Sequence, residues 1–306
     1  MKLPIIKSAI IAGGLALGAS SAYAGDALTV VSWGGAYTKS QIEAYHKPYT
    51  AKYGTKIQSE DYNGGLAEIR AQVEAGKITW DVVDLEVSDA ARGCDDGLFE
   101  KISAGSLPNG VNGALPSKDF IPGALQECAV GTIVWSTIYA YDADKYKSKK
   151  PTTISDFFDV KKFPGKRGMR KVPKVNLEWA LMADGVDGKD VYKVLATKAG
   201  QDRAFKKLDT IKNDVLWWEA GAQPPQMLAD GEVVMTSAYN GRIFNAAVTE
   251  KKNFEIVWDR QLFSFDLYAI IKGTPRLKEA LRYVQFSTAS EQLANQARWI
   301  SYGPTR

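Results

Sequence analysis

The residues that could carry out chemistry in this chain are few and do not form a catalytic pattern. His46 is the one histidine among 306 residues, and it lies in a helix-like segment among Tyr, Lys and Pro, where an imidazole usually has a packing role. The chain has no G-x-S-x-G, P-loop, G-x-G-x-x-G or H-E-x-x-H motif, which are the patterns of hydrolase, nucleotide and zinc sites. We therefore expect no enzyme activity, no cofactor and no metal site. A carboxylate-pair hydrolase needs no fixed spacing, so that class stays open.

Several acidic and aromatic residues follow segments that are typical of buried strands. The sequence predicts strands over 28–33, 55–62 and 80–86, separated by helices over 39–52 and 64–75. This alternation predicts a parallel sheet that is covered by helices on both faces. Ligands of such sheets bind at the carboxyl ends of the strands. In this half of the chain those ends are residues 32–37, 63–65 and 86–89.

The second half of the chain predicts another compact α/β region. An aromatic-rich segment, 132–141, has no turn residue and is typical of a strand that crosses between two regions. A basic stretch, 161–174, is interpreted as a loop. The other elements expected here are strands over 215–218, 232–238, 254–258 and 265–271, and helices over 177–183, 202–212, 275–286 and 290–299.

Length and composition are those of a globular protein with about two domains. Hydrophobic residues make up 45% of the chain and charged residues 24%. The formal net charge is +4, and it falls to +2 without Lys2 and Lys7 of the first 24 residues. A charge this small does not indicate a nucleic-acid-binding protein.

Residues 1–24 have the pattern of a secretory signal peptide. Lys2 and Lys7 precede an apolar run over 9–17, and Ala22-Tyr23-Ala24 is a small-x-small cleavage signal. We expect cleavage after Ala24 and release into the periplasm, without a lipid anchor because no Cys lies near the cut. A buried N-terminal helix is the alternative.

The two cysteines, Cys94 and Cys128, are expected to form a disulfide. An isolated pair in an exported protein is usually structural, because the compartment is oxidising. Two buried thiols are the alternative.

Several motifs, taken in order, resemble the periplasmic solute-binding components of ABC importers, and among them the spermidine/putrescine-binding type. They are Ser32-Trp33-Gly34-Gly35-Ala36-Tyr37, Trp80-Asp81-Val82-Val83-Asp84, Ala229-Asp230-Gly231-Glu232-Val233, Tyr239-Asn240-Gly241, Phe265-Asp266 and Tyr302-Gly303-Pro304-Thr305. The resemblance implies an α/β, two-lobed periplasmic-binding-protein fold of type II, with a hinge of crossing strands and a ligand cleft between the lobes. The lobes are expected at 25–138 plus 266–306 and at 139–265. Because the family continues with further helices beyond the last motif, the resemblance also suggests that this sequence is a fragment.

The resemblance also implies a set of ligand-binding residues. Trp33 and Tyr37, beside Ser32 at the first strand end, look like the aromatic wall of the first lobe. Tyr239 stands where relatives have a Trp, although it could equally be a packing residue, and Asp266 matches an acid that binds an amine. Aromatic faces attract cations and cover methylene groups, so these residue types suit a polyamine.

Glu86 ends a buried strand where relatives place a hydroxyl-bearing contact. A carboxylate there would bind an ammonium group directly. The alternative is a solvated acid at a helix N-terminus, which the helix dipole favours.

The second lobe departs from the polyamine pattern. Arg170-Lys171-Val172-Pro173-Lys174-Val175 stands where polyamine binders carry acids. Arg170 in the cleft would suit a ligand carboxylate through a bidentate contact, whereas an exposed basic loop is the simpler alternative. Trp218 and Glu219 are expected in the same region, with Glu219 as a substitute acid.

The function implied is capture of a small cationic amine such as putrescine or spermidine by hinge closure, and its delivery to the transmembrane subunits of an ABC permease. We expect a monomer. The alternative is an amino-acid-like or opine amine that carries a carboxylate. Ferric-ion binding on the same fold would need clustered tyrosines, and no Tyr-Tyr pair occurs.

Overall fold

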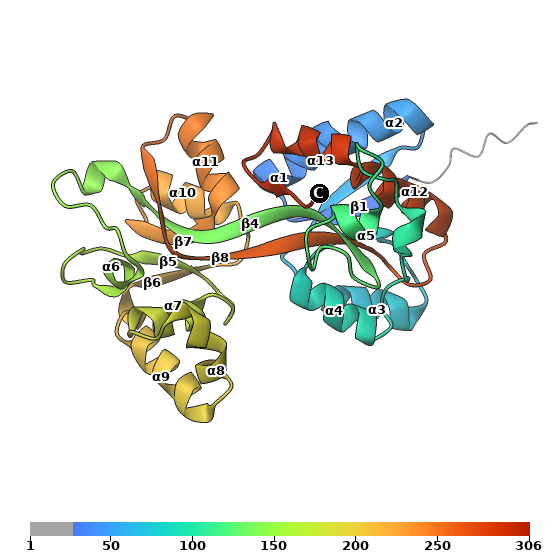
Figure 1. Ribbon diagram of the computed structural model, residues 1–306. Helices are drawn as coiled ribbons and strands as arrows, with labels where there is room; N and C mark the ends of the chain where they lie inside the picture. Colours follow the sequence, from blue (N-terminus) through green and yellow to red (C-terminus); the bar gives the residue numbers. More distant parts are fainter. Residues whose placement is uncertain (1–26) are drawn as a thin grey trace, which may run out of the picture.

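Two lobes joined by two long strands make up residues 27–306, the part of the chain that this computed structural model describes (Figure 1). The strands are β4 (Ala129–Asp142) and β8 (Phe254–Ile270), which pair antiparallel and pass from one lobe into the other. One mixed sheet therefore continues through both lobes, in the order β2-β1-β3-β8-β4-β7-β5-β6, with β9 (Gly303–Pro304) beside β4. The expected signal peptide, 1–24, lies outside the described residues.

The first lobe is built on three parallel strands, as the alternation of the sequence predicts: β1 (Leu28–Ser32), β2 (Ile57–Asp61) and β3 (Val82–Glu86). Every residue of β1 and β3 is buried, which is typical of strands covered on both faces. Its helical segments are α1 (Gly35–Gln41), the π-helical η1 (Ile42–His46), α2 (Lys47–Tyr53), α3 (Ala67–Ala75), α4 (Val87–Asp95), η2 (Ala104–Ser106), α5 (Pro116–Asp119), α12 (Leu277–Ser287) and α13 (Ser290–Ala297).

The second lobe repeats this plan with the parallel strands β5 (Arg167–Arg170), β6 (Val215–Trp218) and β7 (Met235–Tyr239). Its helical segments are η3 (Ala143–Lys145), α6 (Ile154–Phe158), α7 (Asn176–Ala183), η4 (Gly188–Asp190), α8 (Val191–Leu195), α9 (Lys198–Asp209), η5 (Lys212–Asp214), α10 (Gln223–Ala229) and α11 (Asn240–Val248).

The interpretation of 161–174 as a loop is wrong, because this stretch contains β5. The basic composition of this stretch is atypical of a buried strand, so the sequence pattern does not indicate one. Arg167 is nevertheless fully buried, because its guanidinium donates to the carbonyl oxygens of Phe157 and Phe163 at 2.7 and 2.6 Å. The strands expected at 254–258 and 265–271 are two ends of the single strand β8. The residues between them pair with β4 in the hinge, where a polar and irregular sequence gives no clean strand pattern.

The lobe limits predicted at 138/139 and 265/266 fall inside β4 and β8. The pairing of these strands shifts register between Thr137 and Tyr139. Such an irregularity bends a ribbon locally. The exact limits stay a prediction.

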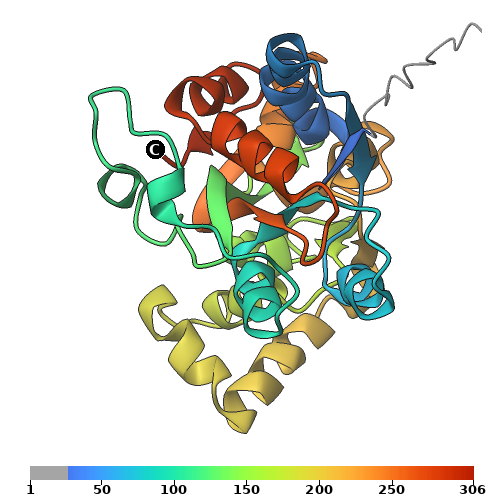
Figure 2. The same ribbon diagram turned by 90° about the vertical axis from the view of Figure 1, so that its right-hand side faces the viewer.

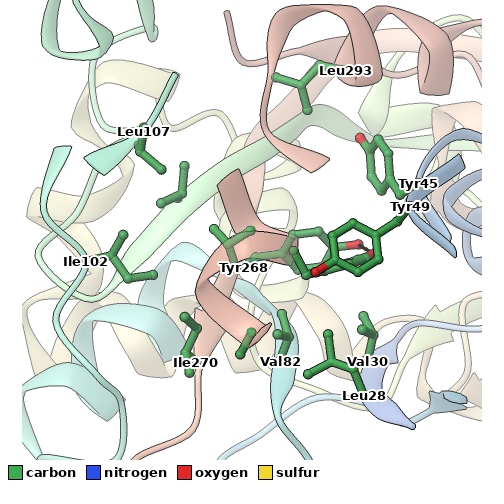
Figure 3. Packing of buried hydrophobic residues seen from close by; sticks show 14 of the residues in the cluster. Leu28, Val30, Tyr45, Tyr49, Val82, Ile102, Leu107, Tyr268, Ile270 and Leu293 are labelled. Carbon is green, nitrogen blue, oxygen red and sulfur yellow. Dashed lines mark hydrogen bonds between the residues drawn. The ribbon is translucent and has the colours of Figure 1, made fainter. Parts of the chain in front are cut away.

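Helices cover both faces of the sheet in the first lobe. Figure 2 looks onto this lobe, with α12, α13 and the α1–α2 helix on one side of the strands and α3 and α4 on the other. Because successive side chains of a strand point to opposite faces, Val30 and Val82 pack with Tyr45, Tyr49 and Tyr268 in one core (Figure 3). Val31 and Val83, the next residues along these two strands, pack in a second core against α3 and α4.

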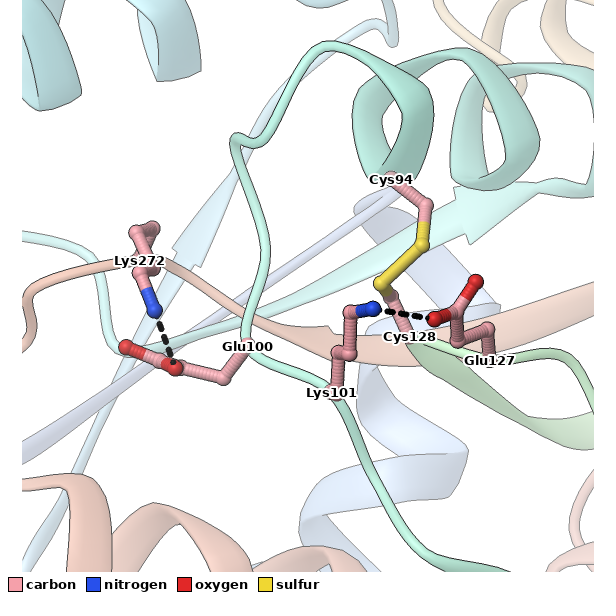
Figure 4. Close-up of a disulfide and its surroundings, with 6 residues drawn as sticks. All are labelled: Cys94, Glu100, Lys101, Glu127, Cys128 and Lys272. Atoms are coloured by element: carbon pink, nitrogen blue, oxygen red, sulfur yellow. Dashed lines mark hydrogen bonds and ion pairs between the residues drawn. A yellow bond between two sulfur atoms is a disulfide. The ribbon is translucent and has the colours of Figure 1, made fainter.

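Cys94 of α4 and Cys128, which precedes β4, form the predicted disulfide (Figure 4). It ties a helix of the first lobe to the start of a hinge strand. The ion pair Lys101–Glu127 lies beside Cys128, and the pair Lys272–Glu100 lies further to the left in the figure. Within residues 27–306 no helix is both long and apolar enough to cross a membrane.

Loss of this disulfide should lower the free energy of unfolding by about 2–4 kcal/mol, because the bridge closes a loop of 34 residues and so restricts the unfolded chain. The measurement is urea unfolding of the protein and of the double variant Cys94→Ser/Cys128→Ser, each with and without reductant. Reductant should shift only the protein that has the bridge. Equal midpoints for the oxidised and reduced wild type would contradict the prediction.

Candidate functional site

The cleft between the lobes holds two adjoining cavities, of about 140 and 20 Å³. Glu86, Trp135 and Tyr239 line both of them. The larger cavity reaches into the second lobe, toward Arg170 and Trp218. The smaller one faces the first lobe and is lined further by Trp33, Tyr37, Ile133, Arg242, Asp266 and Tyr302.

Strand ends place these side chains. Glu86, Arg170, Trp218 and Tyr239 are each the last residue of a parallel strand, in β3, β5, β6 and β7. In both lobes the carboxyl ends of the strands therefore point at one cleft, as expected for parallel sheets. Asp266 joins them from β8, because it pairs directly opposite Glu86 in the antiparallel ladder.

An ion pair crosses the cleft. Arg170 of the second lobe donates from Nη1 to Glu86 Oε1 of the first lobe at 2.7 Å, and Lys174 donates to Oε2 of the same carboxylate. The Arg170 guanidinium also lies 5.9 Å from the ring centres of Trp33 and Tyr239, a distance at which a cation is attracted to a ring face. Burial would raise the pKa of Glu86, but Arg170 and Lys174 outweigh burial and lower it below its ordinary value. Glu86 is therefore a fully paired carboxylate.

Asp266 is buried without such compensation. It accepts a hydrogen bond from Trp135 Nε1 at 2.8 Å and makes no salt bridge with any described residue. Burial, and then the nearby charges of Asp84 and Glu86, raise its pKa well above the ordinary value. A cation in the smaller cavity would therefore meet an acid that has no counter-charge of its own.

Asp84 is a buried acid close to Asp266 that the sequence did not mark as part of the site, although it lines neither cavity. It lies two residues before Glu86 on β3 and so faces the same side of the sheet. It accepts hydrogen bonds from Tyr37 Oη at 2.9 Å and from Gln41 Nε2 at 2.5 Å. The signal was present as two acids at alternate positions of an otherwise apolar strand.

Arg242 of α11 is another residue of the site that the sequence did not mark, and it connects the two lobes. It is buried, lines the smaller cavity, and donates to the carbonyl oxygens of Gly34 and Trp33 at 2.9 and 3.0 Å. Asn240 adds a bond from the second lobe to Ser301 O at 2.8 Å. No sequence pattern marks Arg242, because its partners are backbone atoms more than 200 positions away.

The other lining residues that the sequence did not indicate belong to hinge strands and to the second lobe. Trp135 lies in β4, which contains several aromatic residues, so the sequence does not show which of them faces the cleft. Lys174 lies in the basic stretch. Glu178 and Tyr192 line the far end of the larger cavity. Among residues 27–306, no group of three or more His, Cys, Asp or Glu side chains is arranged to hold a metal ion.

The structure brings seven of the nine predicted ligand residues to the cavities and leaves out Ser32 and Glu219. Ser32 is fully buried at the end of β1 and lines neither cavity. Glu219 lies just after Trp218, the last residue of β6, and lines neither cavity. It is largely exposed and pairs with Lys171. Its expected role as a substitute acid in the cleft therefore has no structural basis.

A comparison with known families identifies the chain. Residues 44–306 match the family described as bacterial extracellular solute-binding protein. The chain belongs to this family. The narrower resemblance to the polyamine-binding type is not supported by the curated relative reported below.

The relatives of this solute-binding protein include proteins whose printed names mention γ-aminobutyric acid or glucopine. A γ-aminobutyric acid-binding protein of Pseudomonas aeruginosa is 44% identical over 291 residues, which cover 95% of this chain and 80% of that protein. The solved structure of the PBP MotA from A. tumefaciens B6 in complex with glucopine is 30% identical, with a TM-score of 0.84 over 91% of this chain and 84% of that one. The Atu4243-GABA receptor structure is 31% identical, with a TM-score of 0.77 over 92% and 83%. These similarities confirm the expected two-lobed α/β fold.

Replacing Arg242 by Gln should open the solute-binding protein, because its two bonds to the carbonyl oxygens of the other lobe are lost. We expect a larger radius of gyration in small-angle X-ray scattering of the ligand-free variant. The control is Lys171→Gln, which removes the same charge from an exposed pair within the second lobe. An Arg242→Gln profile that superposes on those of the control and the wild type would contradict this role.

Proposed function

We propose that this protein is the substrate-binding component of an ABC importer and that it captures a small zwitterion, γ-aminobutyric acid (GABA) or a related ω-amino acid. The ligand would be delivered to a membrane permease after the lobes close around it. Such a ligand is the amino-acid-like amine with a carboxylate that the basic residues 170–174 favour, rather than a polyamine.

The observation that carries the proposal is that both signs of charge face one cleft. Arg170 and Lys174 come from the second lobe, whereas Glu86 and Asp266 come from the first. A ligand carboxylate can take the place of Glu86 on the Arg170 guanidinium, which suits a bidentate contact. The ligand ammonium can then pair with the acids of β3 and β8. Such an exchange leaves no buried charge without a partner.

Charge balance disfavours a polyamine in the same cleft. Two ammonium groups would add positive charge beside Arg170, Lys174 and Arg242. A buried charge that has no partner of opposite sign is costly, because the protein interior solvates ions poorly. A dicarboxylate would fail for the opposite reason, since Asp266 would gain no cation. The net-neutral zwitterion is the class that fits.

The cavity walls suit a short aliphatic chain between the two charged groups. Trp135 and Tyr239 line both cavities, and Trp33 lines the smaller one. Their rings can cover methylene groups while the charged ends reach the strand ends on either side. The printed names of the P. aeruginosa relative and the GABA receptor support the same ligand class.

Closure follows from where the partners lie. Because the carboxylate site is on the second lobe and the ammonium site on the first, a bound zwitterion contacts both and stabilises the closed state. An exported, monomeric receptor that meets its permease at the membrane would use this change as its signal. The predicted signal peptide and the extracellular character of the family support that placement.

GABA should raise the melting temperature of the protein, and putrescine should not. Arg170→Gln should weaken GABA binding in isothermal titration calorimetry by about tenfold or more, because a charge-assisted hydrogen bond contributes on the order of 1.5–3 kcal/mol. Arg170→Lys should restore binding only in part, since Lys keeps the charge but lacks the planar fork.

Lys171→Gln is the matched control and should bind GABA like the wild type, because Lys171 is exposed and faces Glu219 outside the cavities. A wild-type protein that responds to putrescine but not to GABA would overturn the proposal in favour of the polyamine interpretation.

A further inference from the structure

Two buried carboxyl groups beside the smaller cavity have no counter-charge. Asp84 and Asp266 lie on the neighbouring strands β3 and β8, on the same face of the sheet, and Asp266 pairs opposite Glu86. Residues placed diagonally in this way have Cα atoms about 7–8 Å apart. Neither side chain makes a salt bridge within the described part of the chain. Two carboxylates this close in a dry environment cannot both ionise cheaply.

The hydrogen bonds around Asp84 are incomplete. Its Oδ2 accepts from Tyr37 and Gln41, but its Oδ1 is buried and has no partner among residues 27–306. Trp33 Nε1 and Ser32 Oγ also make no hydrogen bond of full geometry in this part of the chain, but both face the Asp84 carboxyl group and lower its pKa in part. A carboxylate oxygen in this situation is stabilised by binding a proton, because leaving a buried ionised oxygen unpaired is costly. Burial raises the pKa of Asp84 to about 7, although its hydrogen bonds oppose this.

Other ionisable groups face the pair from every neighbouring element. The charged ones are Glu86 on β3, Arg170 on β5 and Arg242 on α11. The neutral ones are Tyr37, Tyr45, Tyr62, Tyr239, Tyr268, Tyr283 and Tyr302, whose pKa values are all raised by burial. Glu86 and Arg170 compensate each other, and Arg242 opposes only part of the effect of burial on Asp266. The pair therefore remains short of positive charge.

We propose that Asp84 and Asp266 retain a proton between them in the ligand-free protein, and that an ammonium ligand in the smaller cavity displaces it. This inference rests on the proposed function, because it requires a ligand with an amine. The ligand stays an ammonium ion throughout. The proton leaves a carboxyl group for the solvent, and the carboxylate that remains at Asp266 pairs with the ligand. Asp84 does not line the cavity; it is a positioning residue that acts through Asp266.

The sign of the pH dependence follows directly. At pH values below the range in which the pair loses its proton, protons compete with the ligand. The affinity for the ligand therefore rises with pH, and the rise approaches about tenfold per pH unit where one full proton is released. An ω-amino acid does not titrate between about pH 6 and 8, since carboxyl and amino groups ionise near 4 and 10. The dependence in that range therefore belongs to the protein.

The first test counts protons. GABA is titrated calorimetrically at pH 6.5 in buffers that differ in ionisation enthalpy. The wild type should release about one proton per ligand, and Asp84→Asn should release less than half as much and show a flatter dependence of affinity on pH. Asp230→Asn, a change at an exposed helix end, should release as much as the wild type. Tight GABA binding by the wild type without proton release would overturn this inference and leave the proposed function intact.

A second measurement needs neither a ligand nor a variant. Infrared difference spectra of the ligand-free wild type, recorded between pH 5 and 9, should show a protonated carboxyl group that persists at pH 7. Its absence at that pH would overturn the inference even if GABA proved not to be the ligand. A protein that shows this group but binds no ω-amino acid would contradict the proposed function instead.

Discussion

The ion pair between Glu86 and Arg170 is the interaction on which the closed cleft depends. It joins the last residues of two strands from different lobes, and Lys174 adds a second cation to the same carboxylate. Because Glu86 is buried and Arg170 is largely shielded from solvent, separating them without replacement would be expensive. A ligand that brings its own carboxylate and ammonium provides that replacement. The ligand-free ion pair therefore already displays the charge pattern that a zwitterion would match.

The geometry of the sheet explains why these groups meet. Each lobe has parallel strands whose carboxyl ends face the cleft, and the long strands β4 and β8 carry the sheet from one lobe to the other. The antiparallel pairing of β8 with β3 sets Asp266 opposite Glu86. The hinge strands thus supply cleft residues as well as the connection. A change in hinge register would move the acids and the lobes together.

The sequence could predict the parallel sheet, the crossing strand, the disulfide and the strand-end positions, because these depend on local periodicity and on the compartment. It could not predict Arg242, whose partners are carbonyl oxygens of Trp33 and Gly34 in the other lobe. It could not show that Glu219, just past the end of β6, is exposed and pairs with Lys171 outside the cavities. The family resemblance located the cleft, and the sequence already showed the cations of residues 170–174 as a departure from the polyamine pattern, but only the fold places Arg170 and Lys174 on Glu86. Ligand class depends on the sum of charges from distant segments, which only the fold assembles.

A crystal structure of the protein with a bound ω-amino acid would test the exchange of ion pairs most directly. We predict that the ligand carboxylate lies on the Arg170 guanidinium in place of Glu86, and that the ligand ammonium group lies against Asp266 in the smaller cavity. A ligand carboxylate bound away from Arg170, with the Glu86–Arg170 pair still intact, would contradict it.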